Sequence, residues 1–111
     1  MYNKPIKNIL VVEDSVMFTR IIKRSVESVD SFKVIAVENF ADLKRLLAEN
    51  RYQFFASLLD VNLPDAPNGE VIDYVLGHNI PAIIFTGKLD DSFRKTIYTK
   101  GIVDYVLKEG P

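Results

Sequence analysis

Short apolar runs alternate along the chain with longer segments in which apolar residues return every three or four positions. The first run, 9–12, is continuous and rich in β-branched residues, which is typical of a strand buried on both faces. The segment that follows it has mostly helical spacing, and the alternation continues to residue 107. The expected strands are 9–12, 32–37, 54–59, 81–87 and 103–107, and the expected helices are 16–29, 40–50, 71–76 and 89–101.

This strict alternation of strands and helices predicts a parallel sheet with helices on both faces. Crossover connections between parallel strands are almost always right-handed. With the strand order 2-1-3-4-5, the first crossover runs in one direction and the next three run in the other. The first helix then lies alone on one face, and the other three helices cover the opposite face. We therefore expect one doubly wound α/β domain over residues 1–111.

The last expected strand is followed by only four residues, so the sequence contains no fifth helix to join the first one. One face of the sheet, over the third to fifth strands, is therefore expected to be partly uncovered. We predict that the chain is the N-terminal piece of a longer protein or that a partner completes it. An exposed face or edge of this kind also favours homodimers or the exchange of elements between chains.

The amino-acid composition argues against several classes of function. The 111 residues carry 14 basic and 15 acidic side chains, so no overall field attracts nucleic acid or an anionic membrane surface. Cysteine is absent, which excludes disulfides and thiolate metal sites. We find neither a signal peptide nor an apolar run long enough to span a bilayer. We therefore expect a cytoplasmic protein without direct contact to nucleic acid or membrane.

Polar residues follow the predicted strands at their carboxyl ends. The acidic pair Glu13 and Asp14 follows the first strand, and Asp60 follows the third. Thr86 ends the fourth strand, and Lys108 follows the fifth. This edge of an open α/β sheet is the one that binds ligands. Crowded carboxylates repel one another unless a cation such as Mg²⁺ joins them. A carboxylate nucleophile, a metal ion, a hydroxyl group and a lysine are together the groups needed to move a phosphoryl group onto Asp60.

Four segments give the chain a resemblance to a known family. "LVVEDS", "LLDVNLPD", "IIFTG" and "VDYVLK" stand in the order and at the separations of the receiver domain of two-component response regulators, the CheY-like domain. The resemblance covers nearly the whole chain except the family's last helix. It implies a flavodoxin-like fold with strand order 2-1-3-4-5 and a phosphorylation-dependent switch that controls an output domain or a partner.

The resemblance also implies the roles of the acidic residues. Asp60 is the implied phosphoacceptor, and a histidine kinase or phosphotransfer protein is the implied donor. Glu13, Asp14 and Asp60, with the backbone carbonyl of Asn62, are the implied ligands of Mg²⁺ or Mn²⁺. Asn62 also matches a variable position that tunes loss of the phosphoryl group in this family.

The remaining implied roles fall in the last third of the chain. Thr86 and Tyr105 are the implied switch residues, and Lys108 is the implied contact to the phosphoryl group. Lys88 matches a second position that tunes loss of the phosphoryl group. Glu109 stands where the family usually has a proline after a cis peptide bond. Because a cis bond before a non-proline residue costs about 2.5–4 kcal/mol, we expect a trans or a strained bond there.

Each of these residues also has a simpler interpretation when it is taken alone. Asp60 suits a turn, and Glu13 and Asp14 suit the positive end of a helix dipole. Tyr105 fits core packing as well as it fits switching. We prefer the phosphoacceptor interpretation because four separate strand ends each carry the residue type that the chemistry needs.

Two other classes of function were weighed. A phosphatase with an aspartate nucleophile places Asp-x-Asp after its first strand, whereas Asp60 follows the third strand and Asn62 cannot act as a general acid. A flavodoxin-type nucleotide-binding module needs a Ser/Thr/Gly-rich loop after the first strand, which "EDSVMF" is not, and the chain has no P-loop. A receiver that no longer accepts phosphate and only dimerises is a further interaction-module alternative.

Overall fold

The computed structural model describes residues 5–87 and 91–108. Two sequence-based expectations, on the peptide bond between Lys108 and Glu109 and on Lys88, concern positions outside the described residues. The strands are β1 (Lys7–Val12), β2 (Phe32–Val37), β3 (Phe54–Leu59), β4 (Ala82–Thr86) and β5 (Asp104–Leu107). The helices are α1 (Val16–Glu27), α2 (Phe40–Glu49), α3 (Glu70–Gly77) and α4 (Asp91–Tyr98).

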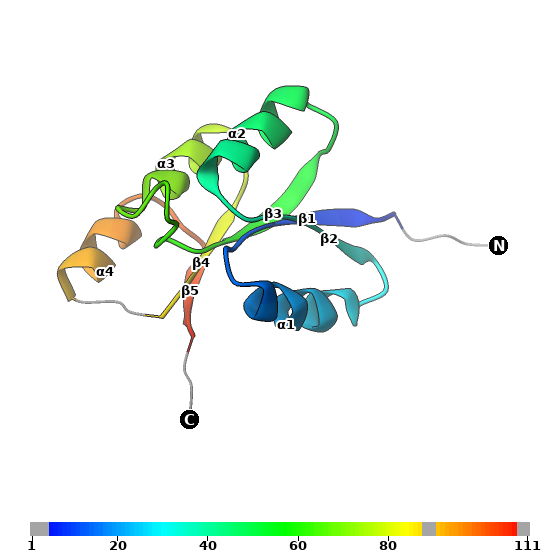
Figure 1. The fold of residues 1–111 in the computed structure, drawn as a ribbon, viewed down its shortest axis with the longest axis horizontal. Coiled ribbons are helices and arrows are strands. Elements are labelled where there is room, and N and C mark those ends of the chain that lie inside the picture. Colours follow the sequence, from blue (N-terminus) through cyan, green and yellow to red (C-terminus); the bar gives the residue numbers. More distant parts are fainter. Residues whose placement is uncertain (1–4, 88–90, 109–111) are drawn as a thin grey trace.

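All neighbouring strands pair in parallel, in the order β2-β1-β3-β4-β5. The predicted topology is therefore confirmed. Val12, the last residue of β1, lies between Val37 and Leu59, and Thr86 lies beside Leu107. The carboxyl ends of the strands consequently meet at one edge of the sheet. Figure 1 shows α1 on one face and α2, α3 and α4 on the other, as the handedness of the crossovers predicts.

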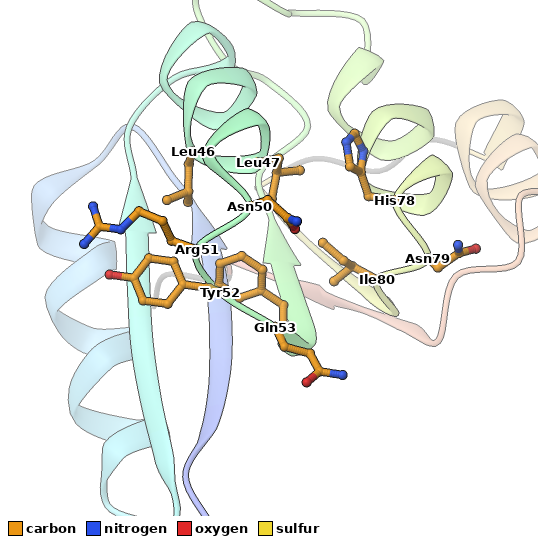
Figure 2. Close-up of a pocket in the computed structure, with 10 residues that line it drawn as sticks. Leu46, Leu47, Asn50, Arg51, Tyr52, Gln53, His78, Asn79 and Ile80 are labelled. Atoms are coloured by element: carbon orange, nitrogen blue, oxygen red, sulfur yellow. The ribbon is translucent and has the colours of Figure 1, made fainter.

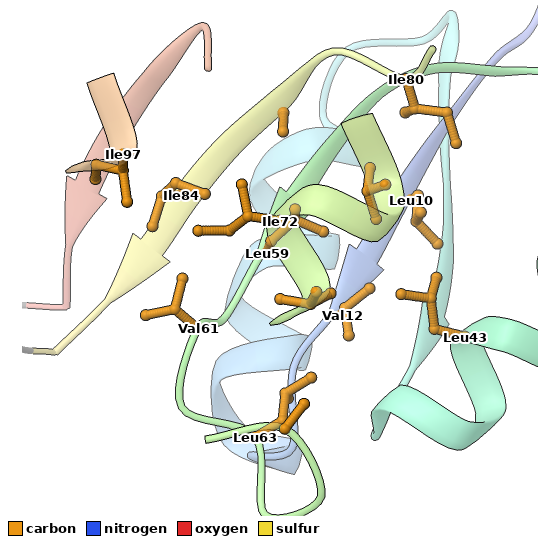
Figure 3. Close-up of a cluster of buried hydrophobic side chains, with 14 residues drawn as sticks. Leu10, Val12, Leu43, Leu59, Val61, Leu63, Ile72, Ile80, Ile84 and Ile97 are labelled. Carbon is orange, nitrogen blue, oxygen red and sulfur yellow. The ribbon is translucent and has the colours of Figure 1, made fainter. Parts of the chain in front are cut away.

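The larger core lies between the sheet and the three helices on its more covered face (Figure 3). Leu10, Leu59 and Ile84, from three neighbouring strands, have no exposed surface. Leu43 of α2 and Ile72 of α3 pack onto them and are also fully buried. Each such side chain contributes roughly 1.5–3 kcal/mol to folding by leaving water, so this layer fixes the central strands that carry the acidic residues.

The opposite face has a smaller core, which α1 covers alone. Its buried members are Ile9, Val11, Ile22 and Val34. Phe55 and Val106 on this side remain 51% and 45% exposed, so the expected partly uncovered face is present in the described part of the chain. An apolar cleft of about 390 Å³ runs there between α1 and the strands β3 and β4.

Two helix starts next to the carboxyl edge are capped by side chains. The sequence offered Asp14 or Ser15 as the cap of α1, and Ser15 takes this role by accepting a hydrogen bond from the Phe18 N–H at 3.3 Å. At α2, the carboxylate of Asp65 accepts from the N–H groups of Phe40 and Ala41 at 2.9 and 3.0 Å. These bonds lower the pKa of Asp65 and tie the loop after β3 to the start of α2.

The predicted helix ends differ from the observed ones by a few residues. α1 ends at Glu27 rather than at residue 29, because the Val29 N–H donates to the Val26 carbonyl three residues back and so leaves the α-helical pattern. α4 ends at Tyr98, and the expected stop residue Gly101 follows with a φ of 79°, which favours glycine. Among the helices in the described residues, none combines the length and apolar character needed to cross a bilayer.

Candidate functional site

Glu13 and Asp60 are held by the backbone at the ends of adjacent central strands. The Glu13 N–H donates to the Val37 carbonyl at 3.1 Å, and the Asp60 N–H donates to the Val12 carbonyl at 2.8 Å. These bonds continue the sheet by one residue on each strand. As a result Glu13 and Asp60 are only 1% and 4% exposed, although both carry a carboxylate.

Asp14, the second acid after β1, is exposed and lies beside the two buried acids. One carboxylate oxygen from each of Glu13, Asp14 and Asp60 lies within 4.8 Å of the other two. Three such oxygens are hard ligands for a small divalent cation, and only Asp14 faces the solvent from which the cation would arrive. The residues present therefore fit the implied Mg²⁺ or Mn²⁺.

Lys108 enters the same cluster from the end of β5. Its Nζ lies 2.5 Å from Glu13 Oε1 and 3.2 Å from Asp60 Oδ2. Its backbone N–H donates to the Thr86 carbonyl at 2.8 Å, which continues the pairing of β4 with β5. The side chain is 11% exposed, so this is an ion pair largely removed from water. The sequence prediction that strands 1, 3, 4 and 5 bring these residues together is thus matched by the geometry.

The charges in this cluster do not balance, because one lysine faces two buried carboxylates. Burial raises the pKa of Glu13, the nearby charge of Asp60 raises it further, and the hydrogen bond from Lys108 only partly opposes them. Burial alone would lower the pKa of Lys108, but its bond to Glu13 and the charge of Asp60 raise it overall. A second cation would relieve the excess of negative charge at the two buried acids.

Both carboxylate oxygens of Asp60 have a partner. Its Oδ1 accepts from the Asn62 N–H at 2.9 Å, which is the local bond by which aspartate starts a turn. Its Oδ2 faces Lys108. The turn orients the carboxylate, and the side chain of Asn62 remains exposed beside it.

Thr86 and Tyr105 lie on the side of the cluster nearer to α4. Thr86 ends β4 and has no exposed surface. Tyr105 is half-buried and packs against the larger core. The Arg94 guanidinium lies 5.4 Å from the centre of its ring, and the Tyr98 ring lies 5.7 Å from it. Tyr105 therefore contacts both the core and α4.

Two aromatic residues at the site were missed in the sequence analysis. Lys108 Nζ lies 4.7 Å from the ring centre of Phe18 and 5.3 Å from that of Phe85. Phe85 could have been found, because it precedes Thr86 and strand alternation directs it to the face that α1 covers. Phe18 lies in the first turn of α1, and no sequence signal directs its ring to the site, because the direction of the ring depends on how α1 is rotated over the sheet.

A separate pocket of about 580 Å³ lies at the amino end of the sheet (Figure 2). It is lined by Leu46, Leu47, Asn50, Arg51, Tyr52, Gln53, Phe54, His78, Asn79 and Ile80. His78, the single histidine, lies here after the end of α3 and not among the acidic residues. This pocket and the charged cluster are thus at opposite ends of the same strands.

Comparisons with solved structures agree with this architecture. The Mn(2+)-bound form of response regulator Rcp1 is 23% identical to this chain, with 95% of this chain and 83% of that one covered and a TM-score of 0.85. RcsB from Salmonella enterica serovar Typhimurium, bound to promoter rprA, is 19% identical, with coverages of 94% and 61% and a TM-score of 0.80.

A probable two-component system response regulator/GGDEF domain protein is 27% identical, with a TM-score of 0.80. The match covers 94% of this chain but only 41% of that protein. A search among curated proteins found no match. The family model of the response regulator receiver domain matches residues 9–111. The chain therefore belongs to the response regulator receiver family, whose members are signalling switches of two-component systems.

Proposed function

We propose that Asp60 accepts a phosphoryl group from a histidine kinase or a phosphotransfer protein in a reaction that requires Mg²⁺ or Mn²⁺. One observation carries this proposal. A buried carboxylate, Asp60, has Lys108 on one side and the acidic pair Glu13 and Asp14 on the other. These are the charges that phosphoryl transfer to a carboxylate needs, and the family membership of the chain supports the same role.

The cation would be held by Glu13, Asp14 and Asp60, with the backbone carbonyl of Asn62 as a further ligand. When bound, it supplies positive charge that offsets the charge of the transferring phosphoryl group. The solved structure of Rcp1 is described as a Mn(2+)-bound form, which supports a divalent cation in a protein of this fold. The crowding of carboxylate oxygens within 4.8 Å supports the same assignment in this chain.

In the proposed transfer, a carboxylate oxygen of Asp60 forms a bond to phosphorus. The bond between phosphorus and the imidazole nitrogen of the donor breaks, and the nitrogen keeps the electron pair. Lys108, with Nζ 3.2 Å from Asp60, contacts an oxygen of the new acyl phosphate, and Thr86 donates from its hydroxyl. Water later hydrolyses the acyl phosphate, so the domain catalyses only its own phosphorylation and dephosphorylation.

The added negative charge draws Thr86 and Lys108 toward the phosphoryl group. Tyr105 lies on β5, three residues before Lys108, and it contacts Arg94 of α4. Movement of Lys108 therefore shifts the population of conformers of the surface formed by α4 and β5, and Tyr105 moves inward. This surface controls the formation of a homodimer, the binding of another partner or the activity of an output domain.

Output domains accompany similar folds in the GGDEF protein and in promoter-bound RcsB. We propose that residues 1–111 are the N-terminal receiver of a longer cytoplasmic response regulator.

The test is the intact mass of the protein after incubation with Mg²⁺ and a small acyl-phosphate donor. Wild type is compared with Asp60→Asn and with Asp30→Asn, which removes an exposed carboxylate outside the cluster. We expect one phosphoryl adduct on wild type and on Asp30→Asn, none on Asp60→Asn, and none in EDTA. An adduct that persists on Asp60→Asn would assign the acceptor elsewhere.

A purified histidine kinase with a phosphorylated histidine provides the second donor. Wild type that gains no adduct from either donor, while its circular dichroism spectrum shows a folded α/β protein, would overturn the proposal. Release of inorganic phosphate in many turnovers from a small phosphoester would instead support the phosphatase alternative.

A further inference from the structure

Lys108 is contacted by two aromatic rings as well as by two carboxylates. Phe18 comes from α1 and Phe85 from β4, and their ring centres are 5.7 Å apart with an angle of 78° between the ring planes. The Lys108 ammonium lies within 5.3 Å of both ring centres. The rings therefore form one contiguous surface against the lysine rather than two separate contacts.

Both rings are fixed by elements that also carry the site. Phe18 lies in the first turn of α1, where its N–H bonds the capping hydroxyl of Ser15. The Ser15 N–H in turn donates to Glu13 Oε2 at 3.0 Å. Phe85 precedes Thr86, whose carbonyl accepts from the Lys108 N–H. The backbone that presents Phe18 is thus linked through Ser15 to Glu13, and the backbone that presents Phe85 is linked through Thr86 to Lys108.

A lysine side chain needs such support because its four-carbon stem has many rotamers. Water at the edge of the sheet would draw the ammonium outward, since lysine readily extends its charged end into solvent. The negative face of an aromatic ring attracts the ammonium, and the ring also excludes water from it. Two rings at 78° to each other lie close to the ammonium, which Glu13 and Asp60 hold as well.

We propose that Phe18 and Phe85 are positioning residues that form an aromatic clamp on Lys108 and keep its ammonium beside Asp60. Both rings contact the ammonium of Lys108, so we expect them to act through the lysine. The clamp is present in the unphosphorylated protein, so its effect on the position of Lys108 is independent of the proposed function. Its effect on the rate of phosphorylation rests on the proposed function.

The first test therefore uses the protein without any donor. Protons beside Nζ of Lys108 lie near two ring faces, so NMR should find them shifted upfield of the same protons in exposed lysines. Phe18→Leu and Phe85→Leu should each remove part of this shift, and the double variant nearly all of it. The control is Phe32→Leu, which removes a ring of the Phe32–Phe55 pair on the same side of the sheet.

The second test measures the rate of adduct formation from the small acyl-phosphate donor. Phe18→Leu should slow it by about three- to tenfold, the size expected for loss of one cation–π contact. In a Lys108→Met background the same change should have little further effect, because Phe18 would have no ammonium left to position. Phe32→Leu should leave the rate unchanged.

The two tests separate the clamp from the proposed function. If wild type forms no adduct, the proposed function fails and the lysine NMR shifts alone decide the clamp. Lys108 protons that keep their shift in the Phe18 and Phe85 variants would overturn the proposal. The proposal would also be overturned if Phe18→Leu slowed adduct formation equally in the wild-type and the Lys108→Met backgrounds. If Lys108→Met does not fold, the NMR comparison still gives a decision.

Discussion

The two ends of the sheet are built from the same strands yet differ in almost every property. At the carboxyl end, Glu13 and Asp60 are nearly fully buried and share one lysine. At the amino end, a pocket of about 580 Å³ is lined by exposed polar side chains such as Arg51, His78 and Asn79 (Figure 2). A cleft of about 540 Å³, lined in part by Asp14 and Asp65, lies at the carboxyl end, so the two ends differ in buried charge rather than in open volume.

The difference follows from the direction of the chain. At the carboxyl end, strands lead into the starts of helices, whose free N–H groups favour acidic and capping side chains such as Ser15. At the amino end, α2 and α3 finish, and Asn50 and Asn79 take left-handed backbone conformations to turn the chain into the next strand. Pocket size alone is thus a poor guide to the site, whereas chain direction and buried charge identify it.

The largest expected contrast concerns ion pairs at the two ends. Lys108→Met leaves Glu13 and Asp60 buried without a counter-charge, so we expect a loss of about 3 kcal/mol in the free energy of unfolding, partly restored by Mg²⁺. Arg51→Met breaks the exposed pair with Glu49 at the amino end and should cost at most about 1 kcal/mol. Urea unfolding of both variants checks this. Equal losses would remove the contrast.

The next contrast is the dependence of metal affinity on pH. Because burial raises the pKa of Glu13 in the metal-free protein, a falling pH protonates this ligand earlier than an exposed glutamate. Mg²⁺ affinity should fall by up to about tenfold per pH unit below that pKa, since one proton must be displaced. The metal-free protein gains stability from Glu13 over the same window, because the folded state binds the proton more tightly than the unfolded state.

Lys108 stays charged throughout that window, since its pKa is raised. Calorimetric titration with Mg²⁺ between pH 5 and pH 7.5 measures the effect. An affinity that does not change with pH would show that Glu13 binds no proton there, and His78→Ala at the other end should leave the profile unchanged.

A smaller contrast concerns the start and end of α1. Ser15→Ala removes the side chain that accepts from the Phe18 N–H, and it should lower the free energy of unfolding by about 1 kcal/mol. Ser28→Ala removes an exposed hydroxyl that bonds the Ser25 carbonyl and should change it by less than about 0.5 kcal/mol. Thermal unfolding of the two variants provides the comparison. A larger loss for Ser28→Ala would contradict it.

The last contrast concerns the backbone conformation of Asn50 at the amino end. Asn50 has a φ of 53°, a conformation that glycine adopts without steric cost, so Asn50→Gly should change the free energy of unfolding by only a few tenths of a kcal/mol. Asn50→Val should lower it by about 1–2 kcal/mol, because a β-branched residue is strained there. Urea unfolding of both variants tests this, and equal tolerance of valine would mean that the left-handed turn is not required.

Much of this molecule could be predicted because its signals are local or follow from topology. Alternating runs predicted the strands and helices of residues 5–87 and 91–108 to within a few residues, and the handedness of crossovers placed α1 alone on one face. The convergence of Glu13, Asp14, Asp60, Thr86 and Lys108 followed from strand order.

The contacts that could not be predicted depend on side-chain direction across elements. The approach of Phe18 to Phe85 requires knowing how α1 is rotated over β4. The bonds from Phe40 and Ala41 to Asp65 join residues that are 25 and 24 positions apart and have no periodic signature. Neither the spacing of apolar residues nor the residue type specifies such contacts, because many rotations of a helix bury the same apolar stripe.

Because Asp65 bonds the start of α2, the first amide protons of α2 report movements of the loop that follows Asp60. Amide protons in the first turn of a helix ordinarily exchange with solvent quickly, because they have no partner inside the helix. Here the amides of Phe40 and Ala41 are shielded only as long as the carboxylate of Asp65 stays in place. The hydrogen exchange rate of these two protons therefore reads out loop movement beside the acidic cluster, from a helix that contributes no residue to it.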